Sequence, residues 1–150
     1  MNQHHTTTTS ARLLTRGLAI AALAGIALVH LVEIPGAFGP MPVLCAMFIA
    51  LTAGAVVVAA ALVHADRRVL WVAAGLTAAG ASGGYSLTRL VAVPFDTGDV
   101  GNWGEPLGLV SLFVQTCLLL LCGYRLLILR DLPARIDQTG PATRSVSSPG

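Results

Sequence analysis

The stretch MPVLCAMFIALTAGAVVVAAALV, residues 41–63, decides the fold of this chain. It carries no charged side chain and is long enough to cross a bilayer as a helix, which takes about 20 apolar residues. Three further apolar runs, at about 17–34, 69–90 and 106–127, lie before and after it and are separated by short polar joints. The sequence therefore predicts four transmembrane helices.

The composition of the whole chain supports this interpretation. Of its 150 residues, 55% are hydrophobic and 11% are charged, and the mean hydropathy is +0.76. Soluble domains carry roughly 25% charged residues, and a water-soluble core of this size could not hide so much apolar surface. We expect a transmembrane domain at 12–129 between disordered polar tails at 1–11 and 130–150. The first run is expected to be retained rather than cleaved as a signal peptide, because His30 and Glu33 interrupt it where a small-residue cleavage site should lie.

The charged side chains are distributed unevenly about the four runs. Of the nine basic residues, all of them arginines, all but Arg89 flank one side of the runs. Because arginine and lysine are enriched in cytoplasmic loops, this asymmetry predicts that both termini are cytoplasmic. The predicted fold class is all-α, an antiparallel four-helix transmembrane bundle with N-in/C-in topology. The flanking arginines are Arg12, Arg16, Arg67, Arg68, Arg125, Arg130, Arg135 and Arg144.

Small residues recur at four-residue spacing in the first and third runs. In lipid, such stripes let helix backbones approach each other closely. We therefore expect them to lie at the contacts between helices. The stripes are Gly17, Ala21 and Gly25 in the first run, and Gly75, Ala79 and Gly83 in the third.

The lipid bilayer is the partner that this composition requires. A membrane protein partner or a second copy of the chain is a further possible partner. No basic run with interleaved aromatic residues is present in the sequence, so nucleic acid is not an expected partner.

Polar side chains gather at the ends of the runs opposite the flanking arginines. The first run carries two of them, three residues apart, and the third run carries a polar stripe at spacings of three and four. The long connection 91–106, VAVPFDTGDVGNWGEP, adds acidic, amide and tryptophan side chains above them. The candidate ligand or partner pocket comprises His30, Glu33, Ser82, Tyr85, Arg89, Asp99, Asn102, Trp103 and Glu105.

The ionisable members of this set lie near membrane depth, where a charge costs roughly 2.5–3.5 kcal/mol on insertion scales. They should therefore face the bundle and have partners. We expect Arg89 to pair with Glu105 or Glu33, and His30 to pair with one of the acids. Two interpretations remain open: an outward-facing polar pocket that binds a small ligand, or a buried ion pair that fixes the register of the helices.

Metal and cofactor chemistry has little support in the sequence. His30, Glu33 and Glu105 are candidate ligands for zinc or another divalent ion, but they show no HxxxH or HExxH spacing. The acids of the loop 96–105 do not match the spacing of a calcium-binding EF-hand loop. Haem held between helices usually has paired histidines, and His30 alone lies at a suitable depth. We expect no cofactor.

The third helix end, its loop and the fourth helix start carry the segments Gly84-Tyr-Ser-Leu-Thr-Arg89 and Asp99-Val-Gly-Asn-Trp-Gly-Glu-Pro-Leu-Gly108, with Pro94 between them. This pattern resembles a motif of small four-span membrane proteins of actinobacteria. The resemblance covers roughly residues 17–128 and implies a protein of the bacterial plasma membrane, but no particular activity. The signature residues that it implies are Tyr85, Arg89, Asp99, Asn102, Trp103 and Glu105.

The leading functional hypothesis is a non-enzymatic protein that binds a ligand or partner through its outer pocket, as an accessory subunit or sensor. One alternative is a small oligomeric transporter or proton-coupled carrier. The polar track beyond Gln115 ends in the leucines at 118–121. The resemblance implies an acid near position 115, where this chain has glutamine. Both features count against a proton path. A second alternative is a membrane oxidoreductase or metal-binding protein.

Overall fold

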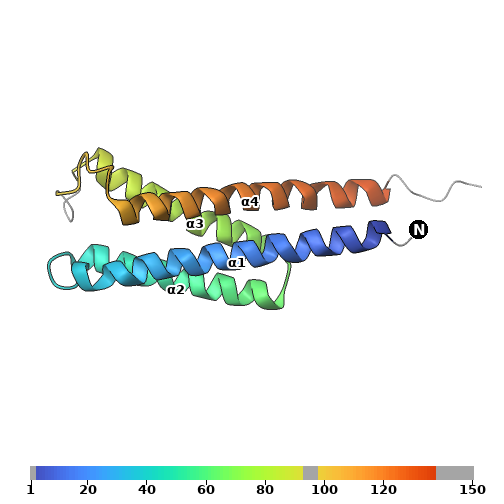
Figure 1. Cartoon of the computed structure of the whole chain (residues 1–150), viewed down its shortest axis with the longest axis horizontal. Coiled ribbons are helices and arrows are strands. Elements are labelled where there is room, and N and C mark those ends of the chain that lie inside the picture. The colour runs from blue at the N-terminus through green and yellow to red at the C-terminus, as the bar shows by residue number, and fades with distance from the viewer. Residues whose placement is uncertain (1–2, 93–97, 138–150) are drawn as a thin grey trace, which may run out of the picture.

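The computed structural model describes residues 3–92 and 98–137, and the side chains of 10–92 and 98–127. All regular structure in these ranges is helical, which confirms the predicted all-α class (Figure 1). The helices are α1 (Gln3–Ala37), α2 (Pro42–His64), α3 (Arg68–Leu90) and α4 (Pro106–Asp137).

Three of the four described helices are long and apolar enough to cross a membrane: α1 over Ser10–Ala37, α2 over Pro42–His64, and α4 over Pro106–Leu127. Their apolar side chains also lie on the outside of the molecule, where large residues such as Val57 and Leu120 are mostly exposed. This distribution is that of a membrane protein. Helix α3 is not among the three, because glycine, serine and threonine make up much of its second half.

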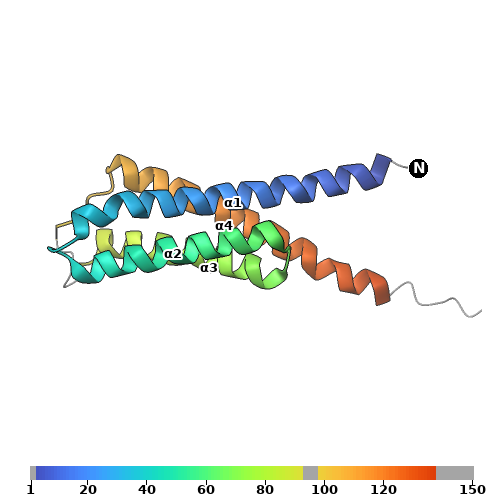
Figure 2. The same ribbon diagram turned by 90° about the horizontal axis from the view of Figure 1, so that it is seen from below.

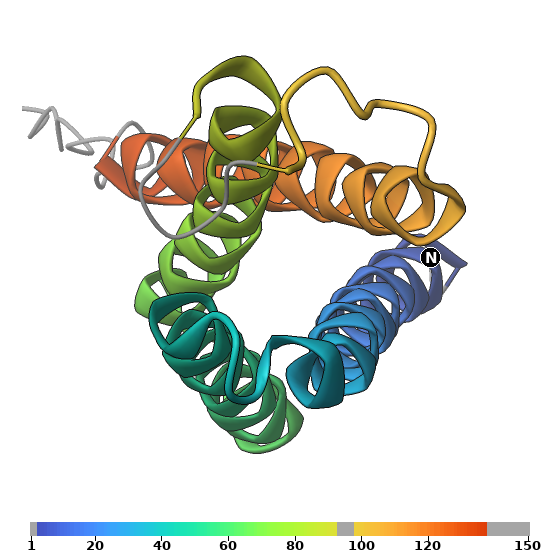
Figure 3. The same ribbon diagram turned by 90° about the vertical axis from the view of Figure 1, so that its left-hand side faces the viewer.

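The four helices lie side by side around a common axis. Viewed along that axis, α1 packs on α2 and α4, and α3 packs on the same two helices (Figure 3). The α1–α2 and α3–α4 connections lie together at one end, which we call the loop end, and the α2–α3 connection lies at the other, which we call the arginine end (Figure 1). Beyond the arginine end, α1 and α4 extend past their neighbours (Figure 2).

The helix ends differ from the sequence-based expectation. Residues 3–11 were expected to be disordered, but they belong to α1, and α4 continues past position 130 to Asp137. Adding a residue to an existing helix costs far less than starting one, so the apolar spans extend into their polar flanks. Residues 138–150 of the expected C-terminal tail lie outside the described residues.

The turn between α1 and α2 also begins later than its sequence suggested. Pro35 lies inside the last turn of α1, where its missing N–H removes only one helical hydrogen bond. The chain then reverses at Gly39, whose φ of +95° is a conformation that glycine adopts at no steric cost. Pro42 occupies the start of α2, a position that needs no backbone N–H donor.

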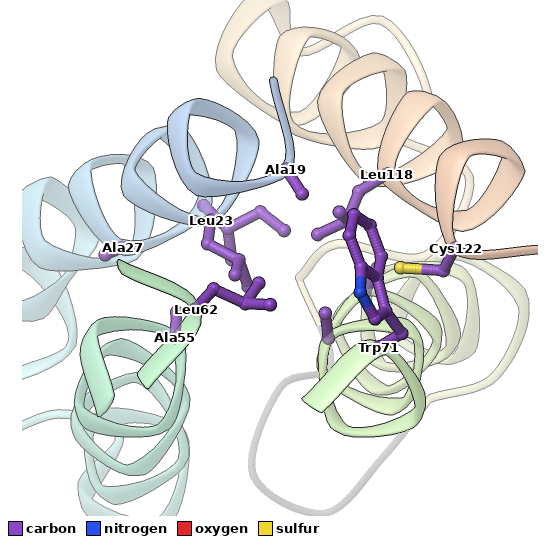
Figure 4. Close-up of a cluster of buried hydrophobic side chains, with 11 residues drawn as sticks. Ala19, Leu23, Ala27, Ala55, Leu62, Trp71, Leu118 and Cys122 are labelled. Carbon is purple, nitrogen blue, oxygen red and sulfur yellow. The ribbon is translucent and has the colours of Figure 1, made fainter. Parts of the chain in front are cut away.

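The packed core lies toward the arginine end, since it includes Leu62 near the end of α2 and Trp71 near the start of α3. Figure 4 shows its side chains. Trp71 of α3 is fully buried, and Leu118 and Cys122 of α4 pack beside it. Helices α1 and α2 complete the cluster with leucine and alanine side chains, among them Leu23 and Leu62. This core closes the space between the four helices below the loop end.

The predicted contacts of the small-residue stripes are wrong for most positions. Ala79 and Gly83 face away from the other helices, as do Gly17 and Ala21. Of both stripes, only Gly25 and Gly75 lie against a neighbour: an added Cβ at Gly25 would be 3.5 Å from Val114, and one at Gly75 would be 3.6 Å from Cys122. Alanines 74, 78 and 81 of α3 lie on its buried face instead, the face that also carries Trp71.

Candidate functional site

A cavity of about 590 Å³ lies between the four helices at the loop end and is partly open to the surroundings. Every helix contributes to its wall, and apolar side chains of α2, among them Leu44, Phe48 and Leu51, cover much of it. Its polar groups come from α1, α3, α4 and the α3–α4 connection. They are His30, Glu33, Tyr85, Thr88, Arg89, Asp99, Glu105, Ser111 and Gln115.

Arg89 is the anchor of the loop end. Its side chain is only 3% exposed and forms ion pairs with Asp99 and with Glu105, the latter at 2.6 Å from Nη2 to Oε2. The predicted pair of Arg89 with Glu105 is therefore confirmed. The backbone N–H of Gly101 also donates to the Arg89 carbonyl at 2.9 Å. One residue at the end of α3 thus fixes both the α3–α4 connection and the start of α4.

Tyr85 lies one turn before Arg89 and is held on both sides. The Arg89 guanidinium carbon is 4.7 Å from the centroid of the Tyr85 ring, a cation–π distance. Trp103 meets the same ring edge-on, with 6.1 Å between the centroids. The ring also lies directly over the backbone of Gly108, where an added Cβ would overlap it. Only glycine at 108 leaves room for this arrangement.

His30 is buried on α1 and faces the cavity. Its Nδ1 lies 2.8 Å from the carbonyl oxygen of Ile26, one turn earlier, and its ring meets Phe48 edge-on at 5.5 Å. Among the residues that the structure describes, no carboxylate lies within ion-pair distance of His30. The expectation of an acidic partner is therefore wrong, because a backbone carbonyl of its own helix satisfies the imidazole.

Glu33 lies one turn beyond His30, also lines the cavity and is partly exposed. It lies within electrostatic range of Arg89, Asp99 and Glu105. No cation in the described part of the chain forms an ion pair with it, since Arg89 is engaged by the other two carboxylates. Glu33 is thus a carboxylate at the cavity without a partner of opposite charge.

A chain of hydrogen bonds connects α3 to α4 at the bottom of the cavity. The Ser82 hydroxyl donates to Gln115 Oε1 at 2.9 Å, and Gln115 Nε2 donates to the Ser111 hydroxyl at 2.7 Å. Gln115 is only 1% exposed, so these bonds satisfy a fully buried amide. Ser111 and Gln115 belong to the site although the sequence-based set left them out; their spacing of four on one helix face was the available signal.

The three remaining residues of the predicted pocket do not line the cavity. Ser82 does not line the cavity and touches it only through Gln115. Asn102 is exposed in the loop, where its backbone N–H donates to the Asp99 carbonyl at 3.0 Å. Trp103 is 41% exposed and supports Tyr85 from outside the cavity. The last two shape the loop rather than the cavity wall.

The proposed metal ligands do not converge. Within the described residues, no group of three His, Cys, Asp or Glu side chains is placed to hold one metal ion. The trio of His30, Glu33 and Glu105 therefore does not form a metal centre in this structure. Asp96, an acid of the loop first considered for calcium, lies outside the described residues.

A second polar cluster lies at the arginine end, where the sequence pattern gave the arginines only a topological role. Asp66 accepts hydrogen bonds from Trp71 Nε1 at 2.6 Å and from Arg125 Nη2 at 2.5 Å. The Arg125 guanidinium carbon also lies 5.1 Å from the centroid of the Trp71 ring. Burial alone would raise the pKa of Asp66, but the bonds from Trp71 and Arg125 outweigh it and lower that pKa.

This arrangement of groups is suited to binding a small molecule. A largely apolar cavity with a few convergent polar groups is the usual form of a small-molecule site, and 590 Å³ falls within the usual range of about 300–1,000 Å³. No protein-family model, curated protein or solved structure matches the chain. The resemblance of segments 84–89 and 99–108 to an actinobacterial motif therefore stays a prediction.

Proposed function

We propose that this chain is a non-enzymatic protein of the bacterial plasma membrane that binds a small molecule in the cavity at its loop end, as an accessory subunit or sensor. In this proposal the four helices form an antiparallel transmembrane bundle with both termini in the cytoplasm. The loop end then faces outward, because the arginines other than Arg89 lie toward the opposite end. The observation that carries the proposal is the cavity itself.

Three hydroxyl groups of α3 support a fourth crossing of the membrane. A polar group inside a bilayer must find its partner within the protein. Thr77 donates to the Ala73 carbonyl at 2.9 Å, Thr88 donates to the Tyr85 carbonyl at 3.0 Å, and Ser82 is bonded to Gln115. With these groups satisfied, α3 carries a smaller penalty in lipid than its composition suggests.

The packed core favours binding over transport. A carrier needs a route from the cavity to the arginine end. Leu23, Leu62 and Leu118 are fully buried below the cavity and fill that route. The transporter alternative is therefore second to a binding protein.

A thermal-shift panel with a cavity-filling variant tests this proposal. Gly84 lines the cavity and Gly83 faces away from it, and an added Cβ meets nothing within 4 Å at either position. Gly84→Leu should fill the cavity, while Gly83→Leu is the matched control. The protein, in nanodiscs of zwitterionic lipid, is heated with tetraphenylphosphonium, tetraphenylborate or triphenylphosphine oxide.

The proposal predicts that at least one of these compounds raises the Tm of the native protein and of Gly83→Leu, but not that of Gly84→Leu, because a bound ligand stabilises only a protein that can hold it. A panel without any such rise, or a rise that persists in Gly84→Leu, contradicts it.

A further inference from the structure

We infer that the ligand of this cavity is an amphipathic organic cation, held by Glu33 and surrounded by apolar walls. The inference rests on the proposed function, since it names the chemical class that the same cavity accepts. Three features of the described residues support it: the balance of charge, the placement of hydrogen-bond acceptors, and the nature of the walls.

The charges around the cavity do not balance. One guanidinium, that of Arg89, faces three carboxylates, those of Glu33, Asp99 and Glu105. Asp99 and Glu105 already occupy Arg89. A buried or half-buried carboxylate without a partner is costly, so a positive charge beside Glu33 would be stabilised there.

The hydrogen-bonding groups on α1 also favour a donor ligand. Because the Ile26 carbonyl can only accept, Nδ1 of His30 carries the proton in this contact. In the neutral ring Nε2 is then an acceptor, and no described residue donates to it. The Glu33 carboxylate, one turn further along the same face, accepts only. A protonated amine could be bound by both groups.

The walls suit an apolar body attached to that charge. Met41, just before α2, and Met47 and Phe48 of α2 line the cavity. Methionine side chains are flexible and polarisable and adapt to irregular apolar shapes, and aromatic rings attract organic cations. Small residues of α3, Gly80 and Gly84, leave the space between these walls open.

An anionic ligand fits the same site poorly. It would have to displace Asp99 or Glu105 from Arg89 and would then lie beside the carboxylates that remain. Like charges at such separations repel strongly in a medium of low dielectric constant. The charge that Arg89 offers is therefore already neutralised within the protein.

The test measures binding of two ions of nearly equal shape and opposite charge, tetraphenylphosphonium and tetraphenylborate. Equilibrium dialysis is performed on the full chain in nanodiscs of phosphatidylcholine, with empty nanodiscs as the correction for partition into lipid. The native protein is compared with Glu33→Gln, which removes only the charge, and with Glu33→Asp, which retains it.

We expect saturable binding of tetraphenylphosphonium that Glu33→Gln weakens about tenfold or more and that Glu33→Asp largely restores, as expected for loss of one charge pair. Gly83→Leu should bind as the native protein does, and Gly84→Leu should not bind. Equal affinity of the native protein and Glu33→Gln for tetraphenylphosphonium would overturn the inference, and so would absence of saturable cation binding.

The thermal-shift panel separates failure of this inference from failure of the proposed function. If only tetraphenylborate or the neutral phosphine oxide raises the Tm, and Gly84→Leu abolishes that rise, the cavity is a binding site whose ligand is not a cation. If none of the three compounds raises the Tm, both proposals fail together.

Discussion

Gly108 carries a steric requirement that a single methyl group tests. Its added Cβ would lie 2.9 Å from both Cζ and Oη of Tyr85, and this ring is already confined by Arg89 and Trp103. Gly108→Ala should therefore destabilise the protein by about 1–3 kcal/mol, the usual cost of overpacking. Thermal unfolding in detergent measures the change.

Gly104→Ala is the control for this substitution, because nothing lies within 4 Å of its added Cβ. In a Tyr85→Ala background the space above Gly108 is empty, so the second substitution should cost much less there than in the native chain. An equal Tm for Gly108→Ala and Gly104→Ala would show that the ring does not confine position 108.

Asp66 makes stability at the arginine end depend on pH. Its pKa is lower in the folded protein than in the unfolded chain, so the unfolded chain binds more protons at acidic pH. This contribution is complete above the ordinary aspartate pKa of about 3.9 and is lost as the pH falls through the lower folded value. Asp66→Asn should remove it.

Tm values between pH 7 and pH 3 measure this effect. At neutral pH the native protein should be more stable than Asp66→Asn, and the difference should shrink as the pH falls below about 4. Other carboxylates titrate in both proteins, so only the difference reports on Asp66. A difference in Tm that stays constant down to pH 3 would contradict the assignment.

For individual side chains, the sequence predicted some interaction partners and missed others. The rule that a charge at membrane depth needs a partner led to the pair of Arg89 and Glu105. The same rule failed for His30, whose partner is a backbone carbonyl of its own helix and has no sequence signature. Asp66 and Arg125 are 59 residues apart, and nothing in the pattern of arginines distinguishes a paired one from one that marks only topology.

Helix α1 stabilises the end of α2 through Arg16. Its Nε donates to the carbonyl of Leu62 and its Nη2 to that of Val63, in the last turn of α2. The last carbonyls of a helix lack intrahelical donors and carry partial negative charge, so a cation there is stabilising. Arg16→Gln should lower stability by about 1–2 kcal/mol, measured as a lower Tm.

Arg12→Gln is the matched control for Arg16→Gln, because it removes the same charge from the same flank of α1 and Arg12 is exposed. Any effect of arginine number on membrane orientation is then equal in the two variants. If both variants lose the same Tm, the contact between α1 and α2 contributes no specific stability.

The elements themselves were largely predictable, whereas their ends and faces were not. Each of the four apolar runs is a helix, because a run of such residues has few other ways to satisfy its backbone. The pattern could not show how far a helix extends into its polar flank, as α1 does from Gln3. Nor did it reveal that alanines 74, 78 and 81, rather than Gly75, Ala79 and Gly83, form the buried face of α3.

The whole molecule has two unlike ends. At the arginine end the four helices meet in a packed core, and at the loop end they surround a cavity. Hydropathy predicts which segments enter the membrane, but the space between them depends on how the helices cross, which no single run of sequence encodes. The structure places six of the nine candidate residues around one cavity, and that cavity follows only from the structure.

A cavity that opens to the outside of the cell is central to the proposed function, and thiol labelling tests it directly. Gly84→Cys and Gly83→Cys are made in a chain whose three native cysteines, Cys45, Cys117 and Cys122, are replaced by alanine. A membrane-impermeant methanethiosulfonate reagent is added to intact cells. The cysteine thiolate attacks such reagents and displaces methanesulfinate, and the thiolate forms in water and not in lipid.

The Gly84→Cys variant, whose thiol lies on the cavity wall, should be labelled rapidly from outside. The Gly83→Cys variant, whose thiol lies on the outward face of α3, should not be labelled. Equal labelling of the two variants, or labelling of Gly84→Cys only after the cells are opened, would contradict an outward-facing cavity.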